Sequence, residues 1–80
     1  MPASPDDGAA RAARVSEALA ETERLLLARL AQALTSDIDQ ADWAQRKLAE
    51  LRLFVASMTG QATRLQVELA ESIRAEVMAA

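Results

Sequence analysis

Three aspartates, Asp37, Asp39 and Asp42, lie close together in the middle of the chain. Carboxylate oxygens at this spacing could bind Ca²⁺, but an EF-hand loop also needs a central glycine and a terminal bidentate glutamate. The stretch has neither. Helix capping explains the carboxylates better, because they accept hydrogen bonds from the first N–H groups of a helix and suit its dipole. We therefore expect no metal site.

The side chains that most enzymes use for acid–base or nucleophilic chemistry are missing. The 80-residue sequence contains no histidine, cysteine or tyrosine, which removes most general bases, nucleophiles and transition-metal ligands. A serine or threonine nucleophile would have only Lys47 or a carboxylate as its base. We expect no catalysis, no cofactor and no small-molecule substrate.

Charge and hydropathy exclude two further classes of function. The formal net charge is −3 and the basic residues are interspersed with acidic ones, whereas nucleic-acid binding needs a basic face. No apolar run approaches the roughly 20 residues that span a bilayer. The first residues lack the basic and apolar regions of a cleaved signal peptide. These features predict a protein of the cytoplasm, or one secreted without a cleaved signal peptide.

The composition favours helix, since 51% of the residues are hydrophobic and only 2% are aromatic. Residues 1–8 hold both prolines and are predicted to form a flexible tail, with Asp7 as the N-cap of the first helix. Residues 9–80 then form a single helical domain. The first helix, from Ala9 to about Leu34, has an apolar face that recurs at the helical period: Val15, Leu19, Thr22, Leu26, Leu30 and Ala33.

The segment 35–40 is the strong interior break, and its Asp37-to-Gln40 spacing resembles a capping box. A connection this short turns the next helix back against the first. That second helix, from about Gln40 to Met78, carries apolar residues in alternating steps of four and three, which define a heptad seam: Ala44, Leu48, Leu51, Val55, Met58, Ala62, Leu65 and Leu69.

Gly60 is the residue that could end this helix early, because a glycine inside a helix costs about 1 kcal/mol. The heptad phase passes through Gly60 without a slip, which favours a continuous helix. We therefore predict an all-α, antiparallel two-helix hairpin with a long second helix. A break at Gly60 would give a three-helix bundle instead.

Unequal helix lengths would leave part of the second helix uncovered. The first helix would end opposite the mid-sixties, so the apolar stripe formed by Leu69, Ile73 and Val77 would have no intramolecular cover. Such a stripe is typical of a binding surface. The two aromatic residues, Trp43 and Phe54, flank the seam and either pack over the first helix or anchor a partner. The candidate partner or oligomer contacts are Trp43, Phe54, Leu65, Leu69, Ile73 and Val77.

The turn and the start of the second helix carry a pattern of polar and aromatic residues: Ser36, Asp37, Lys47, Leu48, Glu50, Leu53 and Phe54. This pattern resembles the needle subunits of type III secretion systems, in which the turn commonly reads Pro-Ser-Asp-Pro and the later stretch Lys-Leu-Ser-Glu-Tyr-Asn-Leu-Tyr. Thr35 and Ile38 stand where that family has prolines.

The resemblance implies a helical hairpin that packs into a hollow filament. The chain is also similar to the small hairpin co-chaperones whose apolar helix face covers the needle subunit's C-terminal helix. We therefore expect a non-enzymatic protein-interaction component of a type III secretion apparatus, either subunit or co-chaperone. The alternative is a coiled-coil adaptor or regulatory scaffold that self-associates through the heptad seam.

Overall fold

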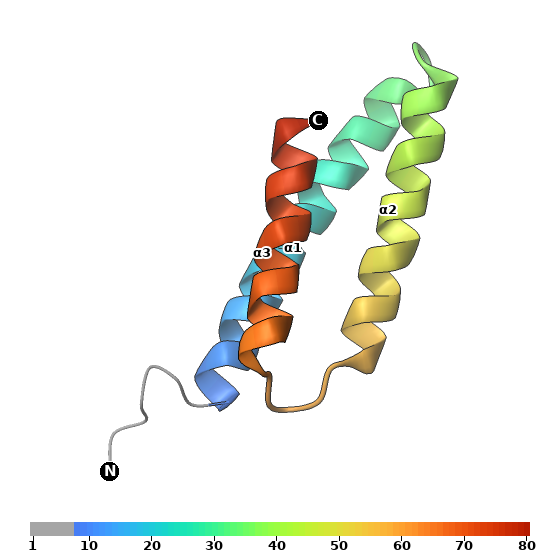
Figure 1. The fold of residues 1–80 in the computed structure, drawn as a ribbon. Helices are drawn as coiled ribbons and strands as arrows, with labels where there is room; N and C mark the ends of the chain where they lie inside the picture. The colour runs from blue at the N-terminus through green and yellow to red at the C-terminus, as the bar shows by residue number, and fades with distance from the viewer. Residues whose placement is uncertain (1–7) are drawn as a thin grey trace.

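The computed structural model describes residues 8–80, which form three helices joined by two short connections (Figure 1). Helix α1 spans Gly8–Ala33, α2 spans Ile38–Ser57 and α3 spans Arg64–Ala79. The predicted tail and its Asp7 cap lie outside the described residues, apart from Gly8, which is already helical. The all-helical class is confirmed, and the described residues contain no strand.

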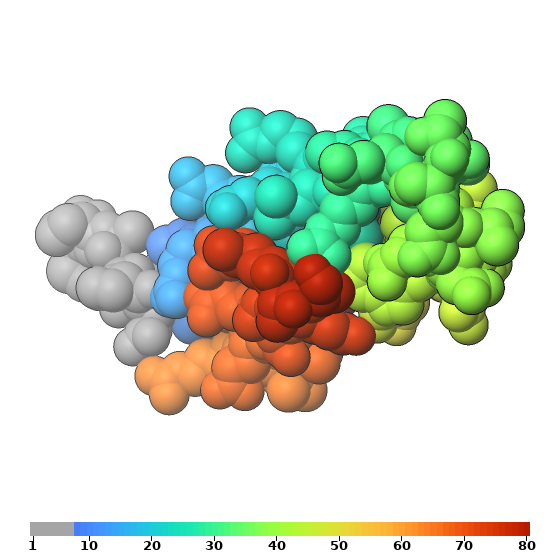
Figure 2. Space-filling view, turned by 90° about the horizontal axis from the view of Figure 1, so that it is seen from above, coloured from blue at the N-terminus to red at the C-terminus, as the bar shows by residue number. Residues whose placement is uncertain are grey.

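Helix α1 lies between the other two helices and packs against both of them. Helix α2 runs antiparallel to α1, and α3 comes back parallel to α1 (Figure 1). No Cα atom of α2 lies within 8 Å of a Cα atom of α3. Seen from above in Figure 2, the C-terminal part of α3 (red) lies beside α1 (blue to green), and α2 (yellow-green) lies at the right of the view.

The apolar face predicted for the first helix is the face that α1 buries. Val15, Leu19 and Leu26 are each less than 5% exposed and belong to the single core cluster. Thr22 is fully buried, and its hydroxyl donates to the carbonyl oxygen of Ala18 at 2.6 Å. That local bond satisfies the hydroxyl and explains how a polar residue occupies the centre of the core.

The turn between α1 and α2 is held by side chains of its own residues. The Ser36 hydroxyl donates to the carbonyl oxygen of Gln32 at 2.9 Å. Asp37 is the N-cap of α2, and its carboxylate accepts from the backbone N–H groups of Asp39 and Gln40 at 3.1 and 3.3 Å. The interpretation of Asp37 as a capping residue is confirmed.

The prediction of one continuous second helix is wrong. Helix α2 ends at Ser57, and residues 58–63 connect it to α3. Thr63 begins α3 with a capping box: its hydroxyl accepts from the N–H of Gln66 at 3.2 Å, and the Gln66 side chain accepts from the N–H of Thr63 at 2.9 Å. Low helix propensity at Gly60 and this strong start signal three residues later together outweigh the heptad phase.

The connection is also fixed to the start of α1. The N–H of Ala62 donates to the carbonyl oxygen of Gly8 at 3.0 Å, and Nε of Arg11 donates to the carbonyl oxygen of Ala62 at 2.7 Å. From there α3 follows α1, with ion pairs from Arg14 to Glu71 at 3.1 Å and from Arg74 to Glu21 at 3.6 Å. These contacts turn α3 back onto the molecule.

Folding α3 back overturns the expected uncovered stripe. Val77, predicted to lie beyond the end of the first helix, is 0% exposed and belongs to the core. Val67 and Ala70, which are not members of the heptad seam, are also buried. The core face of α3 is therefore rotated away from the seam residues Leu65 and Leu69, which are 62% and 46% exposed.

Candidate interaction surface

One ion pair shows which sides of α2 and α3 face each other. Nζ of Lys47 on α2 lies 2.8 Å from Oε1 of Glu76 on α3. Because residues four or seven apart share one side of a helix, the side of α2 that faces α3 also carries Trp43 and Phe54. Both aromatic side chains are half-buried and pack against the core cluster.

The side of α3 that carries Glu76 also carries three large apolar residues. Leu69 and Ile73 precede Glu76 by seven and three residues, and Leu65 lies one turn before Leu69. Ile73 is half-buried, whereas the two leucines are exposed. Five of the six residues predicted for the interface are thus brought to the facing sides of α2 and α3, and Val77 is the exception.

Helical spacing and this ion pair define a candidate surface between the two sides, which we call the α2–α3 groove: Trp43, Lys47 and Phe54 on α2, Met58 directly after α2, and Leu65, Leu69, Ile73 and Glu76 on α3. The pairing of Lys47 with Glu76 sets the antiparallel register. At equal rise along both helices, that register places Phe54 opposite Leu69 and Met58 opposite Leu65. The apolar half of the groove therefore lies near the 58–63 connection and the charged half lies towards the C-terminus.

Lys47 is the centre of the charged half. Its side chain is 19% exposed and pairs with Glu50 at 3.2 Å as well as with Glu76. The hydrogen bond to Glu76 raises the pKa of Lys47 above its ordinary 10.5, and Glu50 adds to this, although partial burial acts in the opposite direction. An open pocket of about 430 Å³ lies here, lined by Trp43, Arg46, Lys47, Glu50 and Glu76.

The raised pKa of Lys47 predicts a loss of stability at alkaline pH. A lysine whose pKa is higher in the folded state stabilises that state fully below the unfolded value, and this contribution disappears as the pH rises through the folded value. We expect Lys47→Met to destabilise the protein by up to about 1 kcal/mol at pH 8. The difference from the unmodified chain should shrink as the pH rises through the raised pKa of Lys47, in urea denaturation followed by Trp43 fluorescence.

Arg46→Met is the matched control for this prediction. Arg46 pairs with Asp42 at 3.2 Å on the same helix, and a guanidinium stays charged throughout this pH range. The chain has no tyrosine or cysteine and no second lysine, so Lys47 is the side chain that titrates there. A Lys47→Met effect that persists unchanged at pH 11.5 would contradict the assignment.

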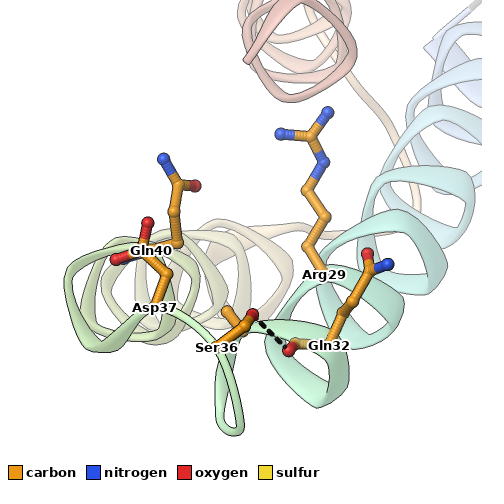
Figure 3. Close-up of a pocket in the computed structure, with 6 residues that line it drawn as sticks. Arg29, Gln32, Ser36, Asp37 and Gln40 are labelled. Carbon is orange, nitrogen blue, oxygen red and sulfur yellow. Dashed lines mark hydrogen bonds between the residues drawn. The ribbon is translucent and has the colours of Figure 1, made fainter.

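A second pocket, of about 390 Å³, lies at the turn between α1 and α2 (Figure 3). Arg29 and Gln32 stand on α1, with Asp37 and Gln40 on the other side of the turn, and the hydrogen bond drawn there joins Ser36 to Gln32. The Asp37 carboxylate already accepts the two capping N–H groups. No group of three potential metal-binding side chains was found among residues 8–80. The hydrogen bonds of the turn therefore account for this pocket.

Two other apolar side chains of α2 are exposed outside the groove. Leu53 is 73% exposed. Val55 belongs to the heptad seam but is 51% exposed, next to an open apolar pocket of about 240 Å³ between α1 and the end of α2. The buried members of the seam are Ala44, Leu48, Leu51 and Ala62.

The pairing of Lys47 with Glu76 was the part of the site that the sequence analysis missed. The pair of Lys47 with Glu50, three residues along the same helix, is a local one. The second partner lies on another helix, so no local spacing could have indicated it.

Comparison with known proteins gives no indication of function, so the functional argument depends on the surface of the molecule. No protein-family model, no curated protein and no solved structure matches this chain. None of the helices in residues 8–80 is long and apolar enough to cross a membrane. The fold class is all-helical, with two helices packed on a third.

Proposed function

We propose that this chain is a non-enzymatic protein-interaction module that binds one amphipathic helix of a partner protein in the α2–α3 groove. The observation that carries the proposal is the pair of facing stripes, in which Leu65 and Leu69 remain exposed beside half-buried Phe54, Met58 and Ile73. Two helices that flank an apolar strip are the usual receptor for a third helix, which inserts apolar residues at spacings of three and four.

The dimensions of the groove suit a short helix. From Trp43 to Met58 the α2 side is about 22 Å long at 1.5 Å per residue, which corresponds to roughly four helical turns of a partner. Apolar partner residues would lie against Phe54 and Leu69. At the other end, Lys47 and Glu76 offer charged hydrogen-bonding groups that fix the orientation of the bound helix.

Within the type III secretion resemblance, the co-chaperone role fits better than the needle-subunit role. The resemblance to a needle subunit implies a two-helix hairpin, whereas this chain has a third helix, α3, that turns back after 58–63 and packs on α1. A co-chaperone needs an apolar surface for the C-terminal helix of the needle subunit. The exposed leucines of the α2–α3 groove support that role, and such a helix is the occupant we propose.

Binding of a synthetic peptide tests the proposal. The probe is the C-terminal helix of a type III needle subunit, with a scrambled peptide of the same composition as the negative control. Trp43, the single tryptophan, lines the groove, so its fluorescence reports binding. We expect Leu65→Glu to weaken binding at least about tenfold, since a charge replaces an apolar contact in the groove.

Leu53→Glu is the matched variant, because it makes the same change at an exposed leucine outside the groove. It should bind the peptide as the unmodified chain does. Both positions are exposed, and a glutamate near the start of α3 also suits the helix dipole, so neither variant should unfold. Equal weakening by the two variants would refute the groove, and no binding of the needle peptide would refute the co-chaperone assignment.

A further inference from the structure

The heptad seam continues through the connection, although most of it is exposed there. Val55, Met58, Ala62, Leu65 and Leu69 keep the alternating steps of four and three across residues 58–63. Ala62 is buried in the core, whereas Val55, Leu65 and Leu69 are all more than 45% exposed. A seam that stays in register on both sides of a turn is the pattern of one continuous helix that packs against another helix.

The connection itself has no feature that forbids a helix. Residues 58–63 contain no proline, and neither glycine of the chain has a positive φ. A Cβ atom built on Gly60 would meet no atom within 4 Å. The turn is stabilised by the Thr63 capping box and by the hydrogen bonds of Ala62 with Gly8 and Arg11.

The contacts of α3 can be made by another molecule without change. Helix α3 packs on α1 through Val67, Ala70 and Val77 and through ion pairs from Glu71 and Arg74. It meets α2 at the pair between Lys47 and Glu76, with no approach of the two backbones within 8 Å. A helix joined to the rest of its chain by a short connection can be exchanged between copies at little cost.

We infer that a second copy of this chain is a partner, bound by exchange of α3. Helices α2 and α3 join through residues 58–63 into one long helix, and α3 packs on α1 of the other copy. Lys47 lies opposite Glu76 in the folded-back chain, so the midpoint of the pairing falls near Gln61 and Ala62. In the dimer this midpoint becomes the two-fold axis between two antiparallel long helices.

The exchanged dimer rebuilds the packing of α3 and adds contacts at the connection. Lys47 pairs with Glu76 of the partner subunit, and every α1–α3 side-chain contact is rebuilt between copies. Dimer formation loses the Thr63 capping box and the hydrogen bonds of Ala62, and it gains helix over 58–63. Val55 and Leu65, exposed in the single chain and close to the connection, become covered where the two long helices cross at the two-fold axis.

Two substitutions in the connection test this inference in opposite directions. Gly60→Ala fits the turn, because its Cβ meets nothing, and it raises the helix propensity of the connection. Thr59→Pro blocks a continuous helix. It suits the turn, since Met58 has φ −76° and ψ 143°, which is the conformation favoured before proline. Light scattering after gel filtration gives the dimer fraction against concentration, and circular dichroism at 222 nm gives the helix content.

We expect Gly60→Ala to tighten dimerisation at least about fivefold, with higher helix content in the dimer. Thr59→Pro should remain a monomer at every concentration and retain the thermal unfolding of a folded protein. Failure of Gly60→Ala to dimerise would overturn the inference. Equal dimerisation of the two variants would also overturn it, because proline cannot join α2 to α3. A Thr59→Pro monomer that binds the needle peptide normally would leave the proposed function standing even if exchange fails.

Discussion

Val77→Asp will lower the free energy of unfolding by about 3 kcal/mol or more, whereas Met78→Asp will change it by less than about 0.5 kcal/mol. Val77 is 0% exposed in the core and Met78, its neighbour, is 60% exposed. An aspartate at position 77 would have to leave its carboxylate unpaired in apolar surroundings, or pull α3 away from α1. Both outcomes are costly for a chain whose whole stability is of the order of 5–10 kcal/mol.

Urea denaturation measures this difference directly. Trp43 fluorescence follows α2, and circular dichroism at 222 nm follows all three helices, so loss of α3 alone would separate the two signals. The comparison also discriminates between folds. In a hairpin with a long second helix, Val77 would lie beyond the end of the first helix and both variants would be equally mild. Equal small effects would therefore contradict the packing of α3 on α1.

The parts of the fold that depend on local signals could be predicted from the sequence. The apolar face of α1 follows from its period, and the burial of Val15, Leu19 and Leu26 confirms it. The turn before α2 follows from Asp37, whose carboxylate caps the helix as expected. In both cases the determining interactions lie within a few residues along the chain, so spacing is enough.

The break between α2 and α3 was a competition between two local signals. The heptad seam favours one helix through Gly60, and the Thr63-to-Gln66 spacing favours a new helix start. The capping box could be recognised in the sequence, but its stabilising effect relative to that of the heptad seam could not. The decision depends on what α3 gains by packing on α1, notably the burial of Val67 and Val77, and that gain is tertiary.

The residues proposed for the interaction surface were placed wrongly by the sequence. Leu69, Ile73 and Val77 were expected on an overhanging end with no intramolecular cover. Val77 is instead buried in the core, and Leu69 lies opposite Phe54 in the register set by the pair between Lys47 and Glu76. This arrangement could not be predicted, because it requires two separate helices where the heptad seam indicated one.

The distance between positions 49 and 75 tests the central claim, that the chain folds back between α2 and α3. The chain has no native cysteine, so Ala49→Cys with Ala75→Cys gives two defined spin-label sites, both on exposed alanines. Pulsed electron–electron double resonance then gives the distance between the two spin labels. It is measured at a concentration where light scattering reports a monomer. One continuous helix would hold the two backbone positions about 39 Å apart at 1.5 Å per residue.

Folded back, Ala49 and Ala75 each lie within a turn of Lys47 and Glu76, whose side chains meet at 2.8 Å. The structure therefore predicts a narrow distribution below about 25 Å. A dominant distance near 39 Å in the monomer would mean that α2 and α3 form one helix, and the groove between them would not exist.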